Sequence, residues 1–294
     1  MNQFKNRHPY MFIAPAVVLL SLFSLFPIVI AFFISFTDMN LKGLADWSSI
    51  SFVGIENYQD LFADDTFIKS IFNTLFYVVF GVPLVIACSL SIALLLNYGT
   101  SWVFNTFRAV YYMPSITNII AVAVIWGYLY NTEYGLFNYI LSFFSIDKVA
   151  WLEDPLMAKI SLILLAVWKG IGINMIIFLA ALQGIPKSYY EAAKIDGANR
   201  FQMLFSVTLP LLRYATFFVT VTTLIGWMQF FEEPFVMTDG GPLDGTISVA
   251  LFIYKEGFRF SEFGYAAAGS FVLFAMIIVV TLIQFKFRKS DTEY

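Results

Sequence analysis

Residues Tyr10–Phe36 read YMFIAPAVVLLSLFSLFPIVIAFFISF and contain no charged side chain. A transmembrane helix needs about 20 mostly apolar residues to cross the hydrocarbon core of a bilayer. The apolar region of a secretory signal peptide has only about 7–15 residues. We therefore interpret this stretch, which follows the basic residues Lys5 and Arg7, as a retained first transmembrane span.

The composition of the whole chain also indicates a membrane protein. Of its 294 residues, 60% are hydrophobic and 13% are charged, whereas a soluble domain carries about 25% charged residues. A single Cys and a single His argue against a disulfide scaffold, a Cys/His metal site and His-based acid–base catalysis. The net charge of −3 has the wrong sign for binding phosphate backbones. We expect membrane lipid as a partner, no nucleic acid and no metal.

Five further stretches are long and apolar enough to cross a bilayer. Backbone groups in the hydrocarbon core must be hydrogen-bonded within their own segment, so we predict helices despite the many Phe, Val and Ile residues. Pro15, Pro27, Pro83 and Pro114 lie in or beside these spans and can kink them. The expected fold is an all-α integral membrane protein with one transmembrane domain over residues 1–294. The predicted spans are residues 10–36, 70–96, 109–130, 158–182, 211–231 and 265–285.

The basic residues predict the orientation of these spans. With both termini in the cytoplasm, ten Lys and Arg residues lie inside and five lie outside, as the positive-inside rule favours. Those inside are Lys5, Arg7, Arg108, Lys187, Lys194, Arg200, Arg213, Lys286, Arg288 and Lys289. Those outside are Lys42, Lys69, Lys148, Lys255 and Arg259.

The connection between the fourth and fifth spans, residues 183–210, reads QGIPKSYYEAAKIDGANRFQMLFSVTLP. Links between packed helices usually take about 2–8 residues, so this connection needs a structure of its own. Pro186 suits the first turn of a helix that includes Glu191–Ile195, and Asp196-Gly197 indicates a turn after it. We predict a helix–turn–helix along the cytoplasmic face.

The two halves of this predicted element have different surfaces. In the first, the small side chains of Ala192 and Ala193 allow the backbone of another protein to approach closely. In the second, apolar residues can face the membrane while Arg200 and Gln202 face water, until Pro210 ends the pattern. The apolar residues are Phe201, Leu204, Phe205 and Val207.

This connection resembles the EAA loop of ATP-binding-cassette importer permeases. The resemblance is carried by Glu191, Ala192 and Ala193, then Gly197, and finally Leu209-Pro210. Where the family pattern usually has Ile, this chain has Val207, a conservative departure. The segments FVGIENY (52–58), IPKSYYEAAKIDGA (185–198) and TDGGP (238–242) are similar to the carbohydrate-uptake, maltose-type branch of binding-protein-dependent permeases.

The resemblance implies a sugar or oligosaccharide importer in a bacterial cytoplasmic membrane, in which the loop is a coupling helix seated in a groove of an ATPase subunit. It implies four kinds of partner: a second homologous permease in a heterodimer, two ATPase subunits, an extracytoplasmic solute-binding protein and the sugar. This chain has no G-x-x-x-x-G-K-[ST] motif, so ATP and Mg are expected in the partner ATPases and the chain itself is not an enzyme. The implied coupling residues are Glu191, Ala192, Ala193, Asp196, Gly197, Leu209 and Pro210.

A charged residue within the fourth span suggests where the substrate passes. Lys at the centre of a membrane helix costs about 2.5–3.5 kcal/mol, so Lys169 should face a cavity, unless it snorkels to the interface or pairs with a carboxylate of a second permease. Its neighbours and the family's cavity positions give further candidates, although each could serve only helix packing. The candidates are Ser115, Thr117, Asn118, Trp168, Lys169, Gly170, Asn174, Thr223, Trp227, Gln229 and Phe230.

Two other functional classes fit the sequence less well. A secondary transporter driven by an ion gradient typically carries buried carboxylates, and the predicted spans contain almost none. An intramembrane enzyme would need a nucleophile and a base. Cys88 lies in an apolar span with no His nearby in sequence, and His8 lies in the cytoplasmic tail, so neither has a catalytic partner.

Overall fold

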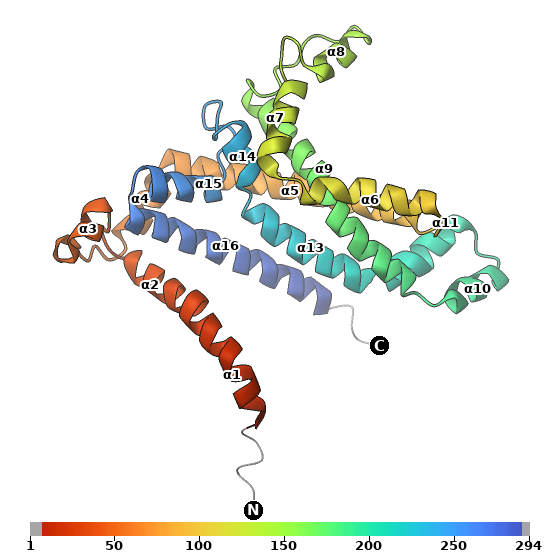
Figure 1. Cartoon of the computed structure of the whole chain (residues 1–294), viewed down its shortest axis with the longest axis horizontal. Helices are drawn as coiled ribbons and strands as arrows, with labels where there is room; N and C mark the ends of the chain where they lie inside the picture. Colours follow the sequence, from red (N-terminus) through yellow and green to blue (C-terminus); the bar gives the residue numbers. More distant parts are fainter. Residues whose placement is uncertain (1–7, 290–294) are drawn as a thin grey trace, which may run out of the picture. The chain divides into compact units, whose positions relative to one another are not determined.

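The computed structural model describes residues 8–289, which are helical apart from turns and one isolated bridge between Thr37 and Phe52. The predicted all-α class is confirmed. Lys5 and Arg7, which contribute to the predicted orientation, lie outside the described residues. Figure 1 shows the helices with the labels used below.

Five helical segments of the described chain are long and apolar enough to cross a membrane, and a sharply bent pair of helices is a sixth candidate. This agrees with the six spans expected from hydropathy. The five segments are Tyr10–Ile34, Asp65–Leu96, Pro155–Gln183, Arg213–Met237 and Phe263–Lys286.

The described residues form two compact units. The first contains the residues up to Ile68 together with Phe252–Met276, and the second contains Lys69–Leu251 and the residues from Ile277 onward. Elements of the first unit are α1 (His8–Leu20), the π-helix η2 (Ser21–Leu25), α2 (Phe26–Ile34), α3 (Leu41–Ala45), the 3-10 helix η3 (Trp47–Ser49), α4 (Glu56–Ala63) and the π-helix η5 (Lys255–Arg259). Three helices contribute to both units: α5 (Asp65–Leu96), α15 (Val249–Tyr254) and α16 (Phe263–Lys289).

The remaining elements belong to the second unit, which carries the candidate site. They are α6 (Trp102–Ile116), α7 (Ile119–Leu129), α8 (Leu136–Ser142), α9 (Pro155–Gln183), α10 (Lys187–Ile195), α11 (Arg200–Met203), the π-helix η4 (Leu204–Thr208), α12 (Leu209–Leu211), α13 (Arg213–Met228) and α14 (Glu232–Met237). In Figure 1, α10 and α11 lie together beyond the C-terminal end of α9.

In the first unit, polar contacts fasten the end of α2 to α4. The Asn57 side-chain amide donates to the carbonyl oxygens of Ser35 and Thr37, at 2.9 Å each. Gly264, at the start of α16, lies so close to this segment that a Cβ atom would come 2.0 Å from the Thr37 carbonyl oxygen. The absence of a side chain at Gly264 therefore permits this close approach.

Both apolar π-helical turns of the described chain have the same local cause. The π-helix Ser21–Leu25 ends two residues before Pro27, and the π-helix Leu204–Thr208 ends two residues before Pro210. Proline has no N–H, and its ring clashes with the carbonyl group four residues earlier. A widened turn just before the proline relieves that clash without breaking the helix.

The third predicted span, residues 109–130, differs from the expectation of one helix. The structure has α6 and α7 instead, bent by 99° at Thr117 and Asn118. Pro114 lies in the last turn of α6, and the Asn118 side chain accepts from the Ile120 N–H at 2.8 Å, which starts a new helix. A proline followed by an N-cap residue thus replaces the expected kink with a helix boundary.

Helix α9 is the central helix of the second unit, since more of its apolar length is buried inside the chain than in any other candidate span of the described residues. It packs closely on α6 at Gly172, where a Cβ atom would lie 2.5 Å from the Tyr111 carbonyl oxygen. The Ser115 hydroxyl of α6 donates to the Lys169 carbonyl oxygen at 2.6 Å. Small and hydroxyl-bearing residues allow such close helix contacts in a membrane.

A hydrophobic cluster joins the ends of α5, α9 and α13 close to the connection between α9 and α13. Its members are Ala93, Leu96, Met175, Phe178, Leu179, Leu182, Leu212 and Val219. Because these side chains are buried together, the ends of the three helices are closely packed beside that connection.

Candidate functional site

The connection between α9 and α13 has the predicted helix–turn–helix structure. Helix α10 ends at Ile195, and Gly197 has a φ of +81°, in the left-handed region. The Ala198 N–H donates to the Ala193 carbonyl oxygen at 2.9 Å, and the Gly197 N–H donates to that of Lys194 at 3.1 Å. These two bonds form a Schellman motif, in which glycine is favoured at the left-handed position. We call residues 187–203 the elbow.

The second arm of the elbow starts with a capping box that the sequence analysis did not identify. The Asn199 side chain accepts from the Gln202 N–H at 2.9 Å, and the Gln202 side chain accepts from the Asn199 N–H at 2.8 Å. The signal was present as Asn followed three residues later by Gln. The turn is therefore fixed by local hydrogen bonds on both sides.

The first arm, α10, has no buried residue. Ile195 is 87% exposed, and the predicted contact residues Glu191, Ala192 and Asp196 are also exposed. Ala193 is half-buried. The exposed face of α10 is therefore available for contact with another protein.

One side-chain contact ties α10 to the following helix. The hydroxyl groups of Tyr190 and Thr208 are 3.2 Å apart, and the Thr208 hydroxyl also donates to the Met203 carbonyl oxygen at 3.2 Å. Thr208 is buried, and Leu209 and Pro210 follow it in the short helix α12. The contact therefore links α10 to η4, which continues through α12 into α13.

Among the substrate-path candidates, Lys169 has a partner within its own chain. Its ammonium group lies 2.8 Å from the Glu232 carboxylate, and the two side chains are 19% and 57% exposed. Glu232 lies just beyond the fifth predicted span, residues 211–231, and the structure places it in the first turn of α14. The ion pair links the middle of α9 to α14.

Several other candidates lie close to this ion pair along α9. Trp168 is 40% exposed and its ring is 5.4 Å from that of Trp126. The Asn174 side chain donates to the Gly170 carbonyl oxygen at 3.2 Å and accepts from the Thr223 hydroxyl of α13 at 3.4 Å. These contacts join α9 to α7 and α13 through polar and aromatic groups.

Trp227 and Phe230 are buried, at 8% and 6% exposure. Their rings are stacked with centroids 5.2 Å apart, and Phe230 also lies 4.7 Å from the Tyr77 ring. Trp227 covers Gly81, where a Cβ atom would be 1.9 Å from its ring. The structure therefore packs both aromatic side chains against α5.

The last candidates are exposed. Thr117 and Asn118 form the bend between α6 and α7, and the Thr117 hydroxyl donates to the Met113 carbonyl oxygen at 2.8 Å. Gln229 follows the end of α13. Within residues 8–289, no group of three or more His, Cys, Asp or Glu side chains is arranged to hold a metal ion.

The comparisons with known proteins cover nearly the whole chain. A probable ABC transporter permease, YesP of Bacillus subtilis, is 36% identical over 96% of this chain and 90% of its own length. The arabinooligosaccharides transport system permease AraP of the same organism is 35% identical over 97% of this chain and 90% of its own length. A chain in the crystal structure of a bacterial alginate ABC transporter, solved in complex with an alginate pentasaccharide-bound periplasmic protein, has a similar fold. Its TM-score is 0.82 at 23% identity, over 100% of this chain and 99% of that chain.

The family model described as the inner membrane component of binding-protein-dependent transport systems matches residues 62–290. The match includes the elbow and the candidate substrate path. This chain therefore belongs to the family of binding-protein-dependent transport system inner membrane components.

Proposed function

We propose that this chain is the transmembrane permease subunit of an ATP-binding-cassette importer that carries a sugar or oligosaccharide into the cytoplasm. The family membership supports this function over transport driven by an ion gradient. The arabinooligosaccharide permease among its relatives supports a saccharide substrate. The observation that carries the mechanism is the structure of the elbow. Its exposed helix, α10, follows the central helix α9 and ends in a Schellman turn.

In this proposal the elbow lies in the cytoplasm and is displaced by its contact with an ATPase subunit. Glu191 and Asp196 provide charged contacts, Ala192 and Ala193 allow close approach, and Gly197 holds the turn. Leu209 and Pro210 carry the movement into α13. ATP and Mg are bound by the two ATPase subunits. A second permease and an extracytoplasmic solute-binding protein complete the assembly, and both termini of this chain are cytoplasmic.

The substrate path is proposed to run beside the Lys169–Glu232 ion pair. Trp168 offers an exposed ring face for a sugar, and Asn174 and Thr223 offer hydrogen-bonding groups. Ser115 on α6 and Gly170 on α9, which faces Val85 of α5, shape the wall. Thr117, Asn118 and Gln229 lie at helix ends where the chain is exposed. Trp227 and Phe230 pack behind the residues proposed to line the path, since both side chains are buried against α5.

Disulfide crosslinking tests the coupling part of this proposal. An Ala192→Cys variant is expected to crosslink to a cysteine scanned along the surface groove of the ATPase subunit, and ATP is expected to change the yield. Ala45→Cys, equally exposed on α3, is the matched control and should give no such crosslink. If the Ala192→Cys variant imports saccharide but forms no crosslink to an ATPase, the proposed coupling is contradicted.

Replacing Lys169 with Gln is expected to change the relative uptake of different saccharides several-fold, because Glu232 loses its partner beside the path. Uptake of a panel of labelled saccharides by cells measures this change. The matched control is Lys148→Gln, which breaks the exposed ion pair with Glu133 and should leave the ranking unchanged. An unaltered ranking in the Lys169 variant would remove this residue from the path.

A further inference from the structure

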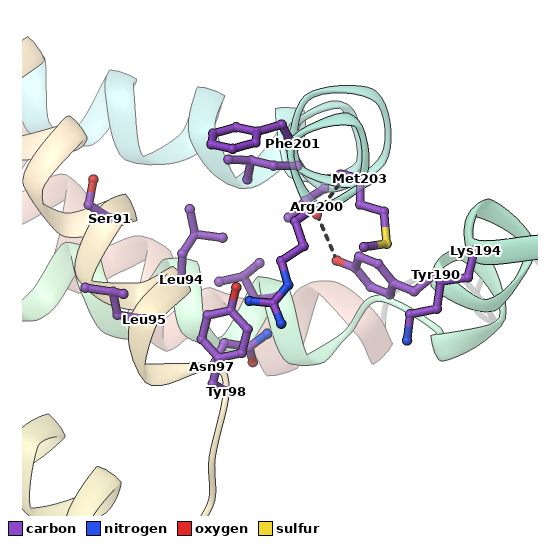
Figure 2. A pocket seen from close by; sticks show the side chains of 13 residues that line it. Ser91, Leu94, Leu95, Asn97, Tyr98, Tyr190, Lys194, Arg200, Phe201 and Met203 are labelled. Atoms are coloured by element: carbon purple, nitrogen blue, oxygen red, sulfur yellow. Dashed lines mark hydrogen bonds between the residues drawn. The ribbon is translucent and has the colours of Figure 1, made fainter. Parts of the chain in front are cut away.

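A cavity of about 790 Å³ lies between the elbow and the end of α5 (Figure 2). Its walls come from α5 and the residues just after it, from the last turn of α9, and from α10, α11 and η4. Pockets that bind small ligands typically have volumes of about 300–1,000 Å³. The coupling residues proposed above do not line it, so the elbow has a second surface with no assigned role.

One wall of the cavity is apolar. It includes Leu94 and Leu95 near the end of α5, Leu182 near the end of α9, and Phe201 and Leu204 in the second arm. Phe201 is 76% exposed and Leu95 is 64% exposed. Leu94, Leu95 and Leu182 lie at the ends of two candidate membrane spans, so this wall is expected near the surface of the bilayer.

The elbow also contributes two cations to the lining, Lys194 of α10 and Arg200 of α11. Neither has a carboxylate within ion-pair distance among the described residues. Figure 2 shows Arg200 extending from α11 toward the end of α5, where Asn97 and Tyr98 provide further polar groups. Two cations without a countercharge, facing an apolar wall, are complementary to a molecule that has an anionic head and a hydrocarbon tail.

We propose that this cavity binds an anionic phospholipid of the cytoplasmic leaflet. The phosphate group lies between Lys194 and Arg200, and an acyl chain lies along the leucine side chains and Phe201. Basic pockets between membrane helices on the cytoplasmic side are known to suit such headgroups. The inference rests on the proposed function for the cytoplasmic placement of the elbow. The bound lipid keeps the side of the elbow that lines the cavity at the membrane surface, while the exposed face of α10 contacts the ATPase.

Photolabelling with lipids tests this inference. The full-length chain, purified with its partner subunits, is placed in nanodiscs of phosphatidylcholine that contain a little phosphatidylglycerol with a photoreactive acyl chain. The adducts are mapped by mass spectrometry without ATP or saccharide. We expect adducts on Leu94, Leu95, Phe201 or Leu204, and far fewer when the photoreactive lipid is phosphatidylcholine. Removing one cation, by Lys194→Gln or Arg200→Gln, should lower this preference about fivefold.

Two controls separate a lipid site from its alternatives. Lys187→Gln removes a cation that is also on α10 but does not line the cavity, and it should keep the preference. Lys194→Arg with Arg200→Lys keeps both charges and should also keep it. Equal labelling by the two lipids, competition by inorganic phosphate, or crosslinks from the cavity to an ATPase peptide would overturn the inference. Because the assay needs no transport, a negative result leaves the coupling proposal standing.

Discussion

Replacing Gly197 with valine is expected to abolish saccharide import while leaving the amount of chain in the membrane unchanged. The φ of +81° at this position is strained for any side chain with a Cβ atom, and most strongly for a β-branched one. The strain of left-handed backbone is about 1–2 kcal/mol per residue. We expect the two Schellman hydrogen bonds to be lost, so that α10 leaves the position that the proposed contact with the ATPase requires.

The effect is conformational, since a Cβ atom on Gly197 would meet no atom within 4 Å. Asparagine tolerates the left-handed region better than other residues with a Cβ atom, so Gly197→Asn should retain most of the import. The measurements are uptake of labelled saccharide, saccharide-stimulated ATPase activity of the reconstituted complex, and immunodetection in membranes. A valine variant with normal stimulated ATPase activity would show that the turn is not needed for coupling.

The elbow could be predicted because its structure is local. Asp196-Gly197 indicates the turn from sequence alone, and the structure closes it with hydrogen bonds to residues of α10. The Asn199–Gln202 capping box is equally local, because its two residues have the three-residue spacing that the motif requires. The number of spans was also predictable, because the length of an apolar segment is set by the thickness of the bilayer.

The arrangement of the proposed substrate path depends on tertiary contacts that no local pattern contains. Lys169 and Glu232 are far apart in sequence, and hydropathy places Glu232 in a loop because it cannot show that the charge meets a cation on α9. In the sequence, Trp227 and Phe230 are compatible with a sugar-stacking surface or with packing, and only their burial against α5 in the structure favours packing. The 99° bend after Pro114 is similarly ambiguous, because membrane helices tolerate proline with or without a break.

Adding one methyl group at Gly172 is expected to destabilise the second unit by about 1–3 kcal/mol, the usual range for overpacking a core. The added Cβ atom would lie 2.5 Å from the Tyr111 carbonyl oxygen and 2.8 Å from the Tyr112 Cα atom. Both are backbone atoms, so the clash is relieved only if α6 moves away from α9. Thermal unfolding of the purified chain and its abundance in membranes measure the effect of Gly172→Ala.

The matched control is Gly127→Ala in α7, where an added Cβ atom would meet nothing within 4 Å. This variant should be as stable as the parent or slightly more so, because alanine favours helix more than glycine does. The Ser115 hydroxyl is also close to Gly172, at 2.6 Å from the added atom. Removing it with Ser115→Ala should not rescue Gly172→Ala, since the two backbone contacts remain. Full rescue would instead mean that the serine side chain, and not the backbone of α6, limits how closely α9 packs.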